Sequence, residues 1–99
     1  LEKDLTNAKK AADGTAMFNY GFNMVYLGLA ERGVAQMEQG LAKGIARNGD
    51  LAKLRMVAVY AQLGQRDKAK QVLAALSGKT DPVGLDDTVR YWTLFLNQP

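Results

Sequence analysis

Residues 17–28 read MFNYGFNMVYLG, and residues 51–64 read LAKLRMVAVYAQLG. Both stretches are strongly apolar and both end in a Leu-Gly pair, with Gly28 and Gly64 lying 36 residues apart (64 minus 28). After each pair, a second segment carries small and apolar residues at helical spacing. A period of ~20 to ~50 residues with two helices per unit is typical of a helical solenoid, whose units bury their apolar faces against one another. The sequence therefore predicts an all-α helical solenoid.

The apolar periodicity and the residues that interrupt it predict about six antiparallel helices in one domain, residues 1–99. These comprise two full helix pairs, in repeat units at about 15–44 and 50–78, with one flanking helix at each end. The expected helices span about 2–12, 15–27, 30–43, 51–63, 66–77 and 86–97.

Glycines are expected to have two structural roles. Gly28 and Gly64 are placed where helices end and tight turns begin. Gly33 and Gly40 lie inside a helix, on one side of it and flanking Met37, although a glycine there costs ~1 kcal/mol relative to alanine. Their placement indicates that another helix approaches closely at these two positions.

Short polar side chains mark the expected helix starts. They accept hydrogen bonds from the backbone N–H groups that a first helical turn leaves unpaired. The expected caps are Asp13 or Thr15 for the second helix, Asp50 for the fourth, and Asp86 or Asp87 for the last.

Composition argues against chemistry of the chain's own. The chain has no His and no Cys, and Ser77 is its single serine. The commonest general base, the commonest metal ligand and the thiol nucleophile are therefore absent. We expect no enzymatic activity, no cofactor and no metal site.

The charge is modest and scattered. Thirteen basic and ten acidic residues give +3, whereas nucleic-acid-binding proteins usually show a denser basic stripe. Nucleic-acid or anionic-surface binding is kept as an alternative, through Lys9, Lys10, Arg66, Lys68 and Lys70. A solvated helix face is the preferred interpretation of these residues.

No apolar stretch reaches the ~20 residues that a membrane span requires, and no leader is visible. Because the chain begins with Leu1 rather than Met, we expect a fragment or a processed product. Bacterial cytoplasm and periplasm both stay open as the compartment.

These segments resemble the tetratricopeptide repeat (TPR) family, whose unit of about 34 residues is a helix-turn-helix. Tyr20-Gly21 and Met56-Val57 fall at the family's Leu-Gly position, and Tyr60 falls at its Tyr. Gly28 and Gly64 match the family's inter-helix glycine. Gly33, Gly40 and Ala69 match its small positions, and Met37 and Leu73 match its large apolar position. The chain departs from the family at its Trp, where Met17 and Lys53 stand, and at a small position that holds Leu76. The stretch 40–92 also looks like the terminal repeats of bacterial TPR proteins.

The resemblance implies a TPR-like solenoid that serves as a scaffold for protein binding, within a longer bacterial repeat protein. In this family the first helix of each unit lines a concave groove for a peptide or a partner helix. Carried over by position, the groove residues are Phe18, Asn19, Phe22, Asn23 and Tyr26 from the first unit, and Leu54, Ala58 and Gln62 from the second. The alternatives are that the aromatic residues belong to the core and that Asn19 and Asn23 are a solvated stripe.

The last helix is richer in apolar residues than one buried stripe requires. Tyr91, Trp92 and Phe95, together with Leu94 and Leu96, are expected to include an exposed apolar patch, and such patches usually mark an interface. We expect weak homodimerisation through this helix. Packing of Trp92 onto the fifth helix is the alternative, and a purely structural or oligomerisation domain is the corresponding alternative function.

Overall fold

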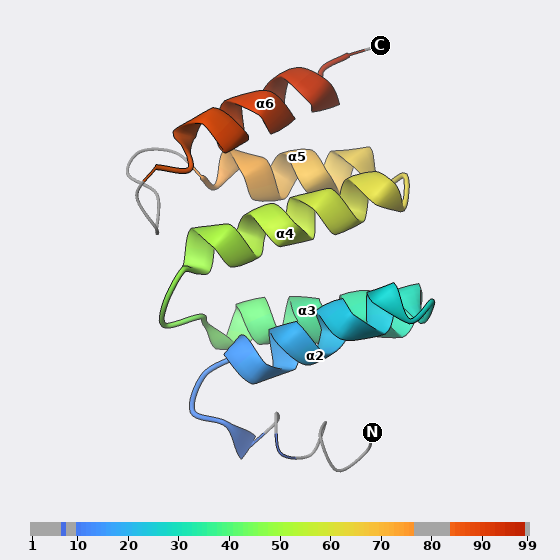
Figure 1. Ribbon diagram of the computed structural model, residues 1–99, viewed down its shortest axis with the longest axis vertical. Helices are drawn as coiled ribbons and strands as arrows, with labels where there is room; N and C mark the ends of the chain where they lie inside the picture. The colour runs from blue at the N-terminus through green and yellow to red at the C-terminus, as the bar shows by residue number, and fades with distance from the viewer. Residues whose placement is uncertain (1–6, 8–9, 77–83, 99) are drawn as a thin grey trace. The chain divides into compact units, whose positions relative to one another are not determined.

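The computed structural model of the chain describes residues 7, 10–76 and 84–98, and every regular element within these ranges is a helix (Figure 1). The all-α prediction is therefore confirmed. The helices, labelled as in Figure 1, are α2 (Thr15–Tyr26), α3 (Ala30–Lys43), α4 (Gly49–Gln62), α5 (Arg66–Ala74) and α6 (Asp86–Leu96).

The predicted six-helix TPR-like solenoid is wrong, because the described residues form five helices. The chain divides into two compact units, Leu1–Ala46 and Arg47–Pro99, and each unit is described by itself. The remaining expected helix, 2–12, lies mostly outside the described residues.

In the first unit, α2 and α3 form an antiparallel hairpin whose backbones meet at glycines. A Cβ atom placed on Gly21 would lie 2.4 Å from the carbonyl oxygen of Gly33, and one placed on Gly40 would lie 2.7 Å from that of Gly14. Only glycine fits at such distances, so the close approach predicted from Gly33 and Gly40 is confirmed. The buried apolar side chains of this unit are Met17, Phe18, Met24, Val34 and Met37.

The turn after α2 ends the helix through a glycine in the left-handed region, as expected. Gly28 has φ 87°, its N–H donates to the Val25 carbonyl at 3.1 Å, and the Leu29 N–H donates to the Met24 carbonyl at 2.9 Å. This pair of bonds is a Schellman motif, which pairs carbonyl groups at the end of the helix.

The turn after α4 repeats the same motif 36 residues later in the chain. Gly64 has φ 76°, its N–H donates to the Ala61 carbonyl at 3.1 Å, and the Gln65 N–H donates to the Tyr60 carbonyl at 2.8 Å. The repeat seen in the sequence therefore has a counterpart in local backbone geometry.

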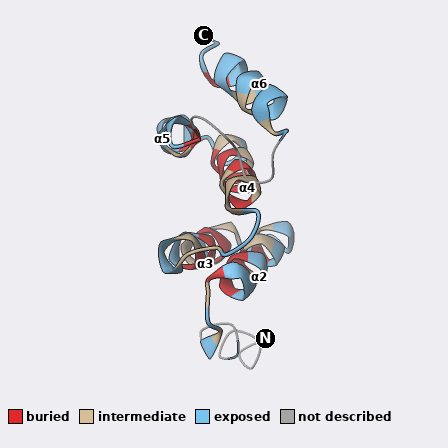
Figure 2. Cartoon of the chain, turned by 90° about the vertical axis from the view of Figure 1, so that its left-hand side faces the viewer, coloured by how far each residue is buried: buried red, intermediate tan, exposed pale blue. Residues whose placement is uncertain are grey.

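In the second unit, α5 packs on α4, and α6 packs on α5 with a smaller contact to α4. Figure 2 draws much of α4 in the colours of buried and half-buried residues. Its adjacent residues Met56 and Val57 are both fully buried. The core of this unit consists of Ala52, Leu54, Met56, Val57, Val59, Tyr60, Ala69, Leu73, Leu76 and Leu96.

α5 ends at Ala74, three residues before its expected end. The N–H groups of Ala75 and Leu76 donate to Val72 and Leu73, at 3.1 and 2.9 Å. These bonds reach back three residues instead of four, so the last turn is tightened, as is common where a helix ends. The tight turn leaves the Leu76 side chain buried.

Acidic side chains lie in the first helical turns rather than at the caps. Asn48, with φ 57°, occupies the cap position of α4, and Leu85 that of α6. Asp50, Asp86 and Asp87 follow inside the first turn, where a negative charge interacts favourably with the positive end of the helix dipole. The expected capping by these three residues is therefore corrected to a first-turn position.

Candidate protein-interaction surfaces

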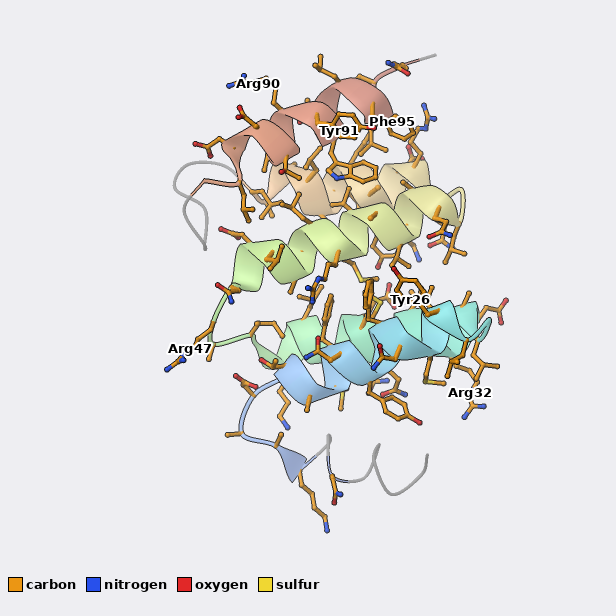
Figure 3. The ribbon with its side chains drawn as sticks, viewed as in Figure 1. Tyr26, Arg32, Arg47, Arg90, Tyr91 and Phe95 are labelled. Carbon is orange, nitrogen blue, oxygen red and sulfur yellow. The ribbon has the colours of Figure 1, made fainter. Side chains whose placement is uncertain are left out.

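α2 carries an exposed stripe that includes several of the predicted groove residues. Asn19, Asn23 and Tyr26 lie at i, i+4 and i+7 and are all exposed, Tyr26 to 78%. Phe22 is half-buried beside them, and its ring meets the Tyr26 ring edge-on with centroids 5.2 Å apart. Figure 3 labels Tyr26 on the helix. The stripe thus combines two amides with an aromatic pair at its C-terminal end.

Two predicted groove residues belong to the core instead. Phe18 is 2% exposed and Leu54 is 4% exposed. For Phe18, the structure agrees with the core alternative. Ala58 is half-buried and Gln62 is exposed on α4, which belongs to the second unit.

Asp13 holds the beginning of α2 against the chain that follows α3. Its Oδ1 accepts a hydrogen bond from the Thr15 N–H at 3.0 Å, and its Oδ2 accepts one from the Ala46 N–H at 3.2 Å. Beside it, the Gly14 N–H donates to the Gly44 carbonyl at 2.7 Å. The hydrogen bond from Thr15, then that from Ala46, lowers the pKa of the Asp13 carboxyl. These bonds fix how the α2 stripe is placed on its hairpin.

α6 carries the second candidate surface. Tyr91 is 60% exposed, Leu94 65% and Phe95 38%, while Trp92 is half-buried. The Tyr91 and Phe95 rings are stacked, with centroids 6.2 Å apart and an interplanar angle of 14°. Figure 3 labels both residues on α6. Trp92 meets both rings edge-on, at 5.7 Å and 5.5 Å. The three predicted self-association residues therefore form one aromatic cluster on this helix.

The basic residues of the nucleic-acid alternative are partly engaged within their own unit. The Arg66 guanidinium donates to the Gln98 carbonyl at 2.7 Å and, more weakly, to that of Leu96 at 3.5 Å. The Lys68 ammonium lies 5.8 Å from the centre of the Tyr60 ring, a cation–π contact. Lys9 lies outside the described residues. The geometry therefore favours structural roles for two of these five cations.

Small-molecule and metal sites find little support in the part of the chain that is described. A hollow of about 200 Å³ lies between α5 and α6, and an open hollow of about 340 Å³ is lined by residues 28–32 alone. Typical ligand pockets have ~300–1,000 Å³ and enclose most of the ligand. Within the described ranges, no three His, Cys, Asp or Glu side chains are grouped so that they could hold a metal ion. None of the described helices combines the length and the apolar character that a membrane crossing requires.

Two exposed apolar residues next to the α2 stripe were not among the groove residues predicted from the sequence. Leu27 is 70% exposed and Leu29 is 39% exposed, one on each side of Gly28. Their position around a helix-ending glycine was the available signal, since the chain leaves the packed face of a helix there.

No family model matches the chain, and comparisons with curated proteins and with solved structures also found no match. The TPR resemblance therefore depends only on the residues quoted above.

Proposed function

We propose that the chain is a protein-interaction module without chemistry of its own, whose first unit binds an extended peptide along α2. The supporting observation is the exposed stripe of Asn19, Asn23 and Tyr26, with Phe22 packed against the tyrosine ring. Each asparagine amide both donates and accepts hydrogen bonds, which is what the backbone of an extended peptide requires.

The spacing of the two amides fits an extended chain. Asn19 and Asn23 are separated by about 6 Å along the helix axis, at 1.5 Å per residue. Peptide groups on one edge of a strand recur every ~6.7 Å, and rotation of the asparagine side chains bridges the small difference. A peptide that continues in the same direction reaches Tyr26 and Leu27, where an apolar side chain of the peptide would find exposed aromatic and aliphatic surface.

The test is selection of binders from a displayed library of linear peptides, followed by affinity measurement with variants. Asn19→Ala combined with Asn23→Ala should weaken the selected peptides roughly 5- to 150-fold, because two hydrogen bonds contribute ~1–3 kcal/mol together. Gln39→Ala, which removes an exposed amide from α3, is the matched control and should bind like the wild type. Circular dichroism should show unchanged helicity in all variants. Failure to select any peptide, or equal binding by the double variant, would overturn the proposal.

A second variant separates the apolar end of the stripe from the amides. Tyr26→Ala should weaken the same peptides without lowering the free energy of unfolding by more than ~1.5 kcal/mol, because the tyrosine is mostly exposed and loses mainly its ring contact with Phe22. A large loss of stability would indicate instead that Tyr26 is held by packing.

A further inference from the structure

α6 presents apolar side chains on two opposite faces. Leu96 is buried and Trp92 is half-buried on the side that packs against the rest of the second unit. Tyr91 and Leu94 lie on the opposite side, since at ~100° per residue they are roughly 140–160° from Leu96 around the helix. Both are well exposed, and Figure 2 shows most of α6 in the colour of exposed residues. A helix covered on one side normally presents a polar face to solvent, so this second face requires a separate explanation.

The aromatic members of this face hold one another in place. Phe95 contacts Tyr91 by stacking and Trp92 by its edge. Side chains that are already ordered lose less conformational entropy when a partner covers them. The face is therefore prepared for contact with another surface.

Charges of opposite sign lie at the two ends of α6. Asp86 and Asp87 are exposed in its first turn. At its last turn, the Arg66 guanidinium is fixed by its hydrogen bonds to the carbonyl groups of Leu96 and Gln98. Arg90 lies between the two ends, 3.6 Å from the Asp87 carboxylate, and offsets part of that negative charge.

From this arrangement we infer that α6 is a self-association site, on which the α6 of a second copy of the chain packs in antiparallel orientation. Antiparallel packing places the acidic end of each α6 beside Arg66 of the other copy. Parallel packing would place the acidic ends side by side, where like charges repel. The two-fold axis passes between Tyr91 and Leu94, so that Tyr91 of one copy meets Leu94 of the other and Asp87 lies opposite Gln98.

The contact is small. α6 has 11 residues and is about 16 Å long at 1.5 Å per residue. One face of such a helix belongs to the class of weak interfaces that bury less than ~1,200 Å². We expect a dissociation constant on the order of 100 μM. The dissociation constant should rise with added salt, because salt screens the charges at the two ends of α6. The site is in the second unit and is independent of the peptide-binding proposal.

Sedimentation velocity over a concentration series tests the face. Leu94→Glu should remain monomeric at concentrations where the wild type forms dimers. Leu27→Glu is the matched control, because it replaces a leucine of similar exposure in the first unit, and it should dimerise like the wild type. A wild type that stays monomeric at millimolar concentration, a dimerising Leu94→Glu variant, or growth beyond dimers would each overturn the inference.

Disulfide cross-linking tests the orientation, since the natural chain has no cysteine. Asp87→Cys and Gln98→Cys should form a disulfide-linked dimer when the two variants are mixed and oxidised. Neither should cross-link alone, because two copies of the same position lie ~16 Å apart in the antiparallel pair and a disulfide requires Cα atoms within ~7 Å. The Gln98 substitution leaves the carbonyl that accepts from Arg66 in place. Cross-linking of each variant alone, or no cross-linking in the mixture, would overturn the antiparallel arrangement.

Discussion

The Asp13 carboxylate accepts a hydrogen bond from the backbone N–H of Ala46, at 3.2 Å and across 33 residues of sequence. The same carboxylate accepts from Thr15 at the start of α2. One side chain therefore joins the two ends of the α2–α3 hairpin.

We expect this carboxylate to make the first unit sensitive to acid. The pKa of Asp13 is lower in the folded chain than its ordinary value, first because of the Thr15 hydrogen bond and then because of the Ala46 bond. A lowered folded pKa means that the stabilisation is fully present above the unfolded pKa and is lost as pH falls through the folded pKa. Urea unfolding of the wild type between neutral pH and about pH 2 should show this loss, and Asp13→Asn should be less stable at neutral pH and change less on acidification. Asp67→Asn, in the second unit, is the control. Parallel pH curves for Asp13→Asn and the wild type would contradict the prediction.

Gly33→Ala should destabilise the first unit although alanine is the better helix former. A Cβ at Gly33 would lie 2.5 Å from the Gly21 carbonyl oxygen and 2.7 Å from the Val25 Cγ2 atom. Overpacking of this kind costs ~1–3 kcal/mol or more, against a gain of at most ~1 kcal/mol in helix propensity. Gly49→Ala is the control, because nothing lies within 4 Å of its Cβ position, and it should be neutral or stabilising. The denaturant midpoints of the two variants measure these changes in stability. A Gly33→Ala variant more stable than the wild type would mean that α2 and α3 do not approach closely.

The two Schellman turns should respond alike to substitution. Gly28→Ala and Gly64→Ala each force a side chain into the left-handed region, at a cost of ~1–2 kcal/mol, while neither Cβ meets another atom within 4 Å. The losses in free energy of unfolding should therefore agree within ~0.5 kcal/mol, provided that each unit is followed by its own probe. A large difference would show that one of the turns is held by something other than backbone conformation.

Arg66→Ala should loosen the end of α6 with only a modest effect on the whole unit. It removes two hydrogen bonds to the carbonyl groups of Leu96 and Gln98, which contribute ~1 kcal/mol at a partly exposed position. Hydrogen exchange of the backbone amides near the end of α6 should become faster. Arg90→Ala is the control, because its ion pair with Asp87 is highly exposed and such pairs contribute ~0–1 kcal/mol. Equal exchange in both variants would contradict the role of Arg66.

Phe18→Ala should distinguish core from binding surface on α2. Truncating a buried phenylalanine costs ~3–5 kcal/mol, whereas Phe22→Ala should cost less because Phe22 is only half-buried. Urea unfolding measures both. A small loss in the free energy of unfolding of Phe18→Ala would indicate instead that Phe18 belongs to the candidate binding surface.

Local features were predictable from the sequence because their causes are local. Gly28 and Gly64 ended their helices as expected, since only glycine adopts the left-handed conformation easily. The close helix approach at Gly33 and Gly40 was also predictable, because a glycine inside a helix requires a compensating contact.

Features that depend on distant parts of the chain were not predictable in the same way. Nothing near Asp13 in sequence indicates the bond to Ala46. On α2, the apolar run gave no means to separate the buried Phe18 from the exposed Tyr26 and Leu27, because burial depends on which face the neighbouring elements cover. The acidic residues of α4 and α6 fell one or more positions inside their helices, since a first-turn carboxylate is stabilised by the helix dipole about as well as a cap is by its hydrogen bond.

The glycine contacts between α2 and α3 also provide a fingerprint for recognising related sequences. Gly14 meets Gly40, Gly21 meets Gly33, and in each segment the two glycines are seven residues apart. At these four positions the backbones leave no room for a side chain, whereas exposed neighbours such as Ala16 and Gln39 do not face that steric limit. Two Gly-x6-Gly spacings separated by a helix-ending glycine should therefore persist in descendants of this hairpin after most of the intervening residues have diverged.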